Sequence, residues 1–340
     1  MSRARAFLAA PEGRLAVIAA LVFALMAWLA PDRFLSAQNL TSMAFQFPEF
    51  AILALAVMLT MLTGGIDLSV VGAANLSAIV AALILTGVGA EGGALWMGAA
   101  AVAALVTGAA AGLFNGVAVA VLGLPPILAT LGSGLVFTGL AIAITGGSAV
   151  MGLPPEAAWL GNARVLGVPV PLVAFGLLAG GLALVLGRTA FGLRVQMFGA
   201  NPLAARFAAM DVTGLLIRVY VVSGAFAAVS GLIVMSRANS AKADYGSSYL
   251  LLAVLIAVLG GVNPYGGYGR VIGVVLAVLS MQFLSSGLNM LGVSNFAREL
   301  IWGLLLILVM IVNAGRWPRL RRPRAAAPRP APAEPHREAP

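Results

Sequence analysis

The side chains that usually carry covalent catalysis are scarce in this sequence. There is no cysteine, and the only histidine, His336, lies in a proline-rich tail. Thiolate nucleophiles, cysteine metal sites and a buried histidine base are thereby excluded. The only lysine, Lys242, follows Ala241 rather than a glycine, so the chain has no G-x-x-x-x-G-K-[ST] phosphate-binding loop. We therefore expect neither a membrane-embedded enzyme nor a chain that hydrolyses ATP by itself.

The acidic residues offer little for coupling to a proton or sodium gradient. Carriers of that kind usually have ionisable groups within their membrane spans. Here no predicted span has an acid in its middle. The acids outside the termini fall in predicted loops or at predicted helix ends: Glu49, Asp67, Glu91, Glu156, Asp211, Asp244 and Glu299. If ATP drives the protein, a separate subunit must bind it.

Polar residues instead gather where apolar runs are interrupted. Residues 62–69 read L-T-G-G-I-D-L-S, with the pair Gly64-Gly65 followed by Asp67 and Ser69. Paired glycines break a helix, and both polar side chains can accept hydrogen bonds from the free N–H groups of the next helix. This stretch is either an ordinary capped turn or a broken helix beside a solute path, where freed backbone groups are tolerated in a membrane protein.

Two further interruptions have the same ambiguity. Pro125-Pro126 followed by Thr130 marks either a plain turn or a re-entrant segment, because proline cannot continue a helix. The third, residues 260–270, begins with Gly260-Gly261 after an apolar run. It echoes the Gly64-Gly65 break, as the two halves of an internal repeat would.

The elements that position these residues are membrane helices. Of the 340 residues, 61% are hydrophobic and 9% charged, whereas soluble proteins are about half apolar and about a quarter charged. The 41 glycines suit close helix packing in lipid. We expect an all-α integral membrane protein, a polytopic bundle of about ten transmembrane helices with broken or re-entrant segments. The predicted spans are 15–30, 47–63, 68–87, 94–122, 127–146, 168–187, 214–236, 249–262, 270–291 and 297–314.

The net charge of +9 comes from arginines at the chain ends and in one long loop, which is the positive-inside pattern rather than a nucleic-acid surface. A polar external loop is expected at 31–39. No A-x-A cleavage site follows the first apolar run, so we expect an uncleaved helix rather than a signal peptide. The predicted domains are a cytoplasmic N-terminus (1–14), a transmembrane domain (15–314) and a disordered basic tail rich in proline and alanine (315–340), with both termini cytoplasmic.

Residues 188–213 form the longest polar stretch inside the bundle. Asn201-Pro202 is a natural helix start, with asparagine as the cap and proline in the first turn. We expect a short amphipathic helix after it on the cytoplasmic face. The stretch is either a solvated loop or, as folded loops of this length often are, a docking site for a partner.

Taken in order along the chain, seven pieces resemble the permease subunits of bacterial ABC importers for ribose and related simple sugars. They are 62–69, Asn115-Gly116, 125–132 (P-P-I-L-A-T-L-G), 139–147 (G-L-A-I-A-I-T-G-G), 199–211, 260–270 and 287–292 (G-L-N-M-L-G). The resemblance covers residues 45–314. Many members have an acid after the tyrosine that precedes the third break, whereas here Tyr249 is followed by three leucines.

The resemblance implies a permease in the bacterial inner membrane that pairs with a second copy or a sister permease. Its partners would be a cytoplasmic ABC ATPase, which uses ATP and Mg²⁺ while this chain binds no cofactor, and a periplasmic sugar-binding protein. The implied ATPase-coupling residues are Arg194, Gly199, Asn201, Arg206 and Asp211. The implied residues for the translocation path or its gating are Gly64, Gly65, Asp67, Ser69, Asn115, Pro126, Thr130, Gly260 and Gly261.

A path for a neutral sugar needs hydrogen-bonding side chains rather than fixed charge. Candidates in or beside the spans are Asn75, Ser77, Asn115, Thr130, Ser133, Ser280, Gln282 and Asn289. For each of them alone, hydrogen bonding between helices is the favoured role. The alternative function is a secondary transporter or facilitator for a small polar solute that works without an ATPase.

Overall fold

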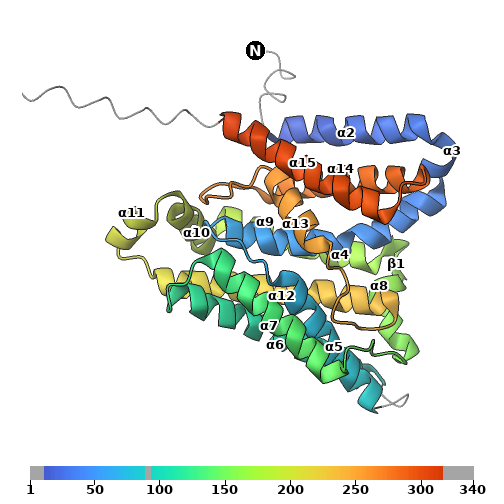
Figure 1. Cartoon of the computed structure of the whole chain (residues 1–340), viewed down its shortest axis with the longest axis horizontal. Helices are drawn as coiled ribbons and strands as arrows, with labels where there is room; N and C mark the ends of the chain where they lie inside the picture. Colours follow the sequence, from blue (N-terminus) through green and yellow to red (C-terminus); the bar gives the residue numbers. More distant parts are fainter. Residues whose placement is uncertain (1–10, 89–92, 317–340) are drawn as a thin grey trace, which may run out of the picture.

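The computed structural model describes residues 11–88 and 93–316, and this part of the chain is almost entirely helical (Figure 1). The helices before the middle of the chain are α2 (Pro11–Leu29), α3 (Pro31–Phe34), α4 (Ala37–Met61), α5 (Val70–Val88), α6 (Gly93–Ala120) and α7 (Pro126–Thr145). A short connection holds the 3-10 helix η2 (Pro155–Ala158), α8 (Trp159–Asn162) and the hairpin β1 (Arg164–Val165) and β2 (Val168–Pro169). The remaining helices are α9 (Val170–Arg188), α10 (Ala190–Ala200), α11 (Pro202–Phe207), α12 (Val212–Ala238), α13 (Tyr249–Leu259), α14 (Val271–Met290) and α15 (Asn295–Arg316).

Within those described ranges, 8 helices are long and apolar enough to cross a membrane. They are α2, α4, α5, α6, α7, α9, α12 and α14. The prediction of an all-α polytopic membrane protein is confirmed. The eighth predicted span, 249–262, is wrong as a complete crossing, because α13 has 11 residues and rises only about 16 Å through a core of about 30 Å. The tenth predicted span corresponds to α15.

The predicted external loop at 31–39 is mostly helical. Pro31 begins α3, and Ser36 caps α4 by accepting a hydrogen bond from the Asn39 amide at 3.2 Å. The Asn39 side chain donates to the Phe34 carbonyl and accepts from Ser286 in α14. These polar residues therefore serve as caps and helix contacts. As a result α4 begins at Ala37, well before the predicted start, and the first helix likewise begins at Pro11, before the predicted Leu15.

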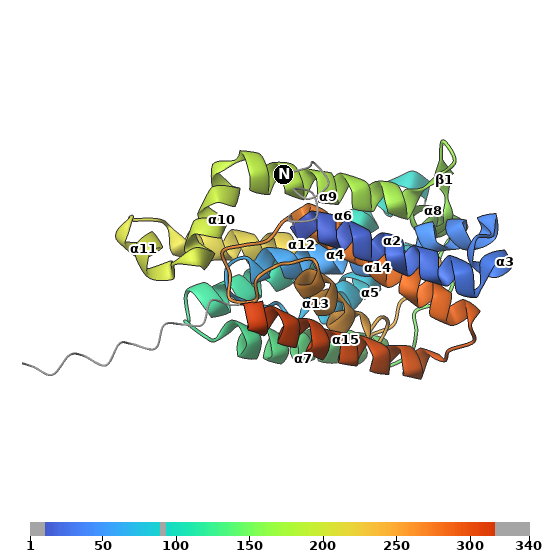
Figure 2. The ribbon, with the colours of Figure 1, turned by 90° about the horizontal axis from the view of Figure 1, so that it is seen from above.

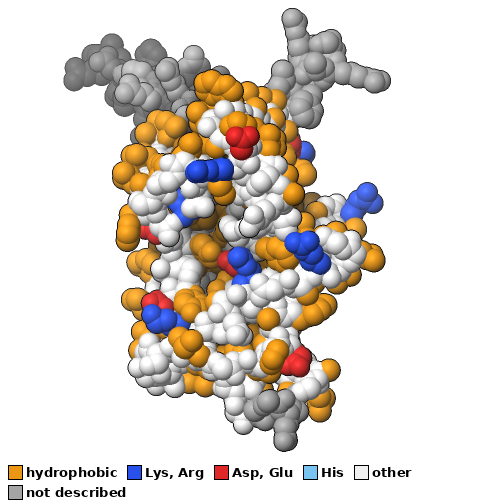
Figure 3. Space-filling view, turned by 90° about the vertical axis from the view of Figure 1, so that its right-hand side faces the viewer, with side chains coloured by type: hydrophobic (Ala, Val, Ile, Leu, Met, Phe, Trp, Pro, Cys, Tyr) orange, Lys and Arg blue, Asp and Glu red, His pale blue; other side chains and the backbone are white. Residues whose placement is uncertain are grey.

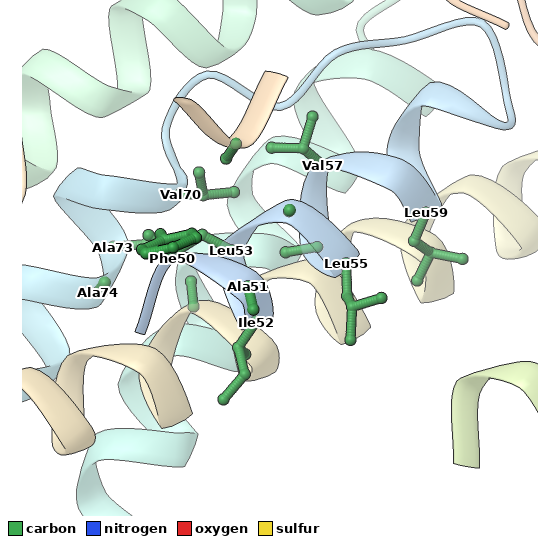
Figure 4. Close-up of a cluster of buried hydrophobic side chains, with 14 of the residues drawn as sticks. Phe50, Ala51, Ile52, Leu53, Leu55, Val57, Leu59, Val70, Ala73 and Ala74 are labelled. Carbon is green, nitrogen blue, oxygen red and sulfur yellow. The ribbon is translucent and has the colours of Figure 1, made fainter. Parts of the chain in front are cut away.

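Helix α4 runs through the middle of the bundle. Every residue from Ala51 to Leu59 is at most 2% exposed. Figure 4 shows that the labelled side chains among them point to different sides of α4, with those of Val70, Ala73 and Ala74 from α5 beside them. Helix α12 packs against α4, α5 and α6. A Cβ on Gly224 of α12 would lie 2.0 Å from the Gly108 carbonyl oxygen of α6. Small residues thus let these backbones touch, as is typical of membrane helices.

The bundle has two distinct ends. Helices α10 and α11 project from the left end in Figure 1, whereas α3, α8 and β1 lie at the right, and the view from above in Figure 2 agrees. An ion pair between Glu12 and Arg270 at 2.8 Å joins the start of α2 to the residue before α14. The start of α2 and the end of α15 both lie toward the α10–α11 end (Figure 1).

The predicted tail, apart from its first two residues, and residues 1–10 lie outside the described residues.

Candidate functional site

The first predicted break is a tight cap at the end of α4. The Gly65 amide donates to the Thr60 carbonyl at 3.3 Å, and Gly64 has a φ of +79°, which favours glycine. A Cβ on Gly65 would lie 2.8 Å from the Tyr220 hydroxyl and 3.0 Å from Cβ of Pro126. Both glycines of the pair are therefore needed, one for its conformation and the other for lack of space.

The third break repeats this cap. The Val262 amide donates to the Ala257 carbonyl at 3.1 Å, and Gly261 has a φ of +81°. The structural counterpart of Gly64 is thus Gly261, one position later than the paired glycines alone indicated. Gly260 instead gives close contact with α14, since its Cβ would lie 2.8 Å from Cα of Val274.

These two breaks touch each other and the end of α10. The Gly267 amide donates to the Leu62 carbonyl at 2.9 Å, and a Cβ on Gly64 would lie 3.2 Å from the Tyr265 carbonyl oxygen. A Cβ on Gly199 would lie 1.9 Å from the Leu62 carbonyl oxygen and 2.4 Å from the Gly267 nitrogen. We call these five residues, Leu62, Gly64, Gly199, Tyr265 and Gly267, the junction.

Next to the junction lies a buried polar network around Asp67, which is 1% exposed. One carboxylate oxygen accepts from the Ser69 amide at 3.0 Å and the Ser69 hydroxyl at 2.6 Å. The other accepts from the Ser223 hydroxyl of α12 at 3.0 Å. Asn115 of α6 donates to the Ser69 hydroxyl at 2.7 Å. We call Asp67, Ser69, Asn115 and Ser223 the Asp67 cluster, and it ties α6 and α12 to the α4–α5 connection.

The second break joins the same region. Thr130 donates to the Ile66 carbonyl at 3.0 Å and to the Pro126 carbonyl at 2.8 Å. Pro126 is the first residue of the full-length α7, so this break is a plain turn rather than a re-entrant segment. Seven predicted path residues therefore converge around the α4–α5 connection: Gly64, Gly65, Asp67, Ser69, Asn115, Pro126 and Thr130. Gly260 and Gly261 lie at the third break, between α13 and α14.

Several other predicted path residues have partners on the backbone. Asn75 donates to the Ala243 and Tyr245 carbonyls, and Ser77 donates to the Ala73 carbonyl of its own helix. Ser133 and Ser280 likewise donate to carbonyls of their own helices. The Asn75 contacts hold the segment before α13 against α5, whereas the three serines bond within their own helices rather than between helices. Gln282 is different, because it lines the pocket described below.

The predicted amphipathic helix after Asn201 is α11. Asn201 caps it by accepting from the Ala204 amide at 3.0 Å, and Asp211 caps α12 by accepting from the Gly214 amide at 2.8 Å. Arg194 and Arg206 are exposed, whereas Gly199 is buried in the junction. Two apolar residues of α11 that were not predicted as coupling residues, Leu203 and Phe207, are 64% and 83% exposed. Their spacing of four residues on a helix that begins at Pro202 was the available signal.

A pocket of about 530 Å³ lies near the other end of the bundle. Its charged and polar residues are Gln46, Glu49, Arg237, Tyr245, Ser248, Tyr249, Gln282, Ser285, Asn295, Arg298, Glu299 and Trp302, with Phe50 among the apolar ones. Figure 3 looks at this end of the molecule, where side chains of both charges are scattered and the surface is hollowed near its middle. We call this cavity the polar pocket.

The polar pocket holds a buried ion pair that was not predicted from the sequence. Glu49 was expected at a helix end, but the early start of α4 puts it inside that helix, 6% exposed. Its carboxylate accepts from Arg237 at 2.6 Å and from the Tyr249 hydroxyl at 3.0 Å. Tyr249, which has no acid next to it in sequence, thus meets one from α4. Among the described residues, no group of three or more His, Cys, Asp or Glu could hold a metal ion.

Comparison with known proteins places this architecture in a family. Residues 39–310, which run from α4 into α15, match the family model described as the branched-chain amino acid transport system permease component. The chain belongs to this permease family. No solved structure matches it.

Named relatives of this permease are transport proteins. The ribose import permease protein RbsC of Escherichia coli (strain K12) is 36% identical over 302 residues, which cover 87% of this chain and 92% of the relative. The autoinducer 2 import system permease protein LsrD of Enterobacter sp. (strain 638) is 35% identical over 76% of this chain and 80% of the relative. RbsC of Bacillus subtilis (strain 168) is 32% identical over 82% and 86%.

The matched region of the permease contains every structural feature described above apart from the first helices. The junction, the Asp67 cluster, α10–α11 and the polar pocket all fall within residues 39–310. Helices α2 and α3 precede it. The α2 helix packs along α14, and a Cβ on Gly287 of α14 would lie 2.2 Å from the sulfur of Met26. The first helix therefore packs on the outside of the region that the family model matches.

Proposed function

We propose that this permease is the membrane-spanning subunit of an ATP-driven importer for a simple sugar or sugar-like solute. A periplasmic binding protein delivers the solute, and a separate cytoplasmic ATPase uses ATP and Mg²⁺. Two kinds of relatives support the solute class, since their names refer to import of ribose and of autoinducer 2. The observation that carries the proposal is the contact of Gly199, at the end of α10, with both helix breaks.

The ATPase docks on α10 and α11 in this proposal. Leu203, Arg206 and Phe207 are exposed on a capped helix that projects from the end of the bundle. An apolar pair beside an arginine is a suitable surface for a protein partner, because such surfaces combine large apolar side chains with arginine. Arg194 adds a second exposed positive charge on α10.

The junction transmits the movement of the docked ATPase. Gly199, Leu62 and Gly267 meet through backbone atoms, so no flexible side chain separates them. Leu62 follows α4, and Gly267 precedes α14 by a few residues. A displacement of α10 therefore moves the ends of both helices, and both helices line the polar pocket further along their length.

In this proposal the permease is oriented in the inner membrane with its arginine-rich end, at α10 and α11, in the cytoplasm. Arg194 and Arg206 lie in α10 and α11, Arg188 ends α9 and Arg218 lies in the first two turns of α12. The positive-inside rule assigns this arginine-rich end to the cytoplasm. The start of α2 and the end of α15 lie toward the same end (Figure 1), so both termini are cytoplasmic in this proposal. A second copy of the chain or a sister permease completes the transport path between them.

Affinity purification from native membranes in mild detergent tests the proposal. The wild-type chain should co-purify with an ATPase that has a phosphate-binding loop, and Arg206→Ala should lose it while remaining folded. Arg33→Ala is the matched control, because Arg33 is exposed at the opposite end of the bundle. Recovery of the wild-type chain alone, with sugar passing through it in ATP-free liposomes, would favour the facilitator function instead.

A further inference from the structure

The polar pocket contains two hydrogen-bond donors that the protein itself leaves unused. Within the described part of the chain, Nε of Arg298 and Nε1 of Trp302 are buried and have no hydrogen-bond partner. A buried donor without a partner costs about 1–3 kcal/mol. Both residues line the pocket. The two N–H groups therefore need acceptor atoms from something that enters the cavity.

The ionic groups of the pocket balance one another. Glu49 is paired with Arg237 at 2.6 Å. Glu299 accepts from the Ser248 hydroxyl, and Arg298 donates to Ser285 and Asn295 through its other nitrogens. Two acids and two arginines leave no excess formal charge. A cavity of this kind has nothing to retain a charged solute, whereas a neutral one enters without an unpaired ion being buried.

The rest of the lining suits a ring that carries many hydroxyl groups. Gln46, Gln282 and Asn295 supply amide groups, which both donate and accept hydrogen bonds. Phe50 and Tyr249 stand edge to face with ring centroids 5.8 Å apart, and they give the pocket an apolar wall for the C–H face of such a ring. The volume of about 530 Å³ lies within the range of about 300–1,000 Å³ typical of small-molecule sites.

The position of the pocket suits the incoming solute. Arg237 lies in the last turn of α12, whose first turn adjoins α11 at the opposite end. A helix of 27 residues is about 40 Å long, so the ion pair lies far across the membrane from the proposed ATPase dock. The pocket is built on α4, α12, α13, α14 and α15, and α4 and α14 lead back to the junction.

We infer that the polar pocket is the permease's own solute site and that it binds a neutral polyhydroxylated ring such as a pentose. The Trp302 and Arg298 N–H groups donate to ring hydroxyl oxygens, and the Glu49 carboxylate, held by Arg237 and Tyr249, accepts from another hydroxyl. This inference deepens the proposed function and rests on it for the solute class.

Saturation-transfer NMR on the full-length permease in detergent tests the inference. D-ribose, D-xylose, D-glucose and ribitol are the neutral probes, and ribose 5-phosphate is the charged one. At least one neutral ring should show saturation transfer with the wild-type protein. Trp302→Phe keeps the ring system apolar but removes Nε1, and should weaken the signal at least tenfold. Trp28→Phe is the matched control, since Trp28 is 77% exposed and outside the pocket.

A second variant guards against misfolding. Arg298→Lys keeps the charge but removes Nε as a donor, and it should weaken binding as Trp302→Phe does while the protein keeps a cooperative melting transition. Equal neutral-sugar binding by the wild type and both variants would overturn the inference, as would binding of ribose 5-phosphate alone. Co-purification of the ATPase is independent of the pocket, so its loss from the wild type would defeat the proposed function and not this site.

Discussion

The amide of Gly267 donates a 2.9 Å hydrogen bond to the carbonyl of Leu62, and Gly199 fits against both residues. This contact joins two similar helix caps from distant parts of the chain. It also joins them to the exposed α10–α11 segment. Three stretches that stand apart in the sequence therefore form one mechanical unit, and changes to each of its parts should have separate, measurable effects.

Gly199→Ala should abolish transport. The new Cβ would lie 1.9 Å from the Leu62 carbonyl oxygen and must push α10 away from the break. Gly180→Ala is the matched control, because nothing lies within 4 Å of its Cβ in α9, and alanine there gains about 0.5–1 kcal/mol of helix stability. Solute uptake in whole cells, compared at equal membrane abundance, is the measurement. Full uptake by Gly199→Ala would show that the junction does not couple α10 to the core.

Ser223→Ala should destabilise the bundle by about 1.5–3 kcal/mol, since it removes a hydrogen bond to a buried carboxylate. The control is Ser77→Ala, because the Ser77 hydroxyl donates only to a carbonyl of its own helix at 2.7 Å. Thermal denaturation in detergent reports both variants. We expect a clearly lower midpoint for Ser223→Ala alone; equal midpoints would mean that the Asp67 cluster adds no stability.

Arg237→Leu should destabilise the protein by about 3–5 kcal/mol, because it leaves the Glu49 carboxylate buried without its cation. The side chains of Arg237 and Glu49 are 25% and 8% exposed. Replacing both residues by leucine should recover part of the loss, since no isolated charge is then left. Lys242→Ala provides the contrast, because its pair with Asp244 lies at the surface and should have no measurable effect. A double variant as unstable as Arg237→Leu would argue against a buried ion pair.

Phe207→Ala should leave the melting temperature unchanged and strongly reduce transport. The side chain is 83% exposed, so its removal costs the isolated permease little. The control is Leu135→Ala, which removes a side chain of 77% exposure from the flank of the bundle on α7. Solute uptake and the melting temperature are measured for both variants. Normal uptake by Phe207→Ala would place the ATPase contact elsewhere.

The membrane class and most spans could be predicted, because an apolar run of about 20 residues matches the thickness of the bilayer core. The start of α4 could not be predicted, because a stretch that contains Ser36, Asn39, Ser42 and Gln46 resembles a polar loop. Their polarity is satisfied by a helix cap, by Ser286 of α14 and by a bond from Gln46 to Ser42 at 2.7 Å. Of these partners, only Ser286 comes from a distant part of the chain and could not be read from the local sequence.

Part of the candidate site could likewise be predicted from the sequence, and part could not. The glycine pairs and Asp67 could be found because backbone breaks and acids between apolar runs are visible in a sequence. The ion pair of Glu49 with Arg237 could not be found, since the two residues lie on helices far apart in the chain. The short length of α13 could not be predicted from the sequence either, because its apolar run continues past the cap at Gly260 into Val262.

We expect this permease to move its solute only with a partner ATPase. The direct test is uptake of radiolabelled pentoses and hexoses into liposomes that contain either the purified chain alone or the complex with its co-purified ATPase and binding protein. We predict uptake only by the complex, only with ATP, and none with a non-hydrolysable ATP analogue. The same uptake by the chain alone in ATP-free liposomes would contradict this claim.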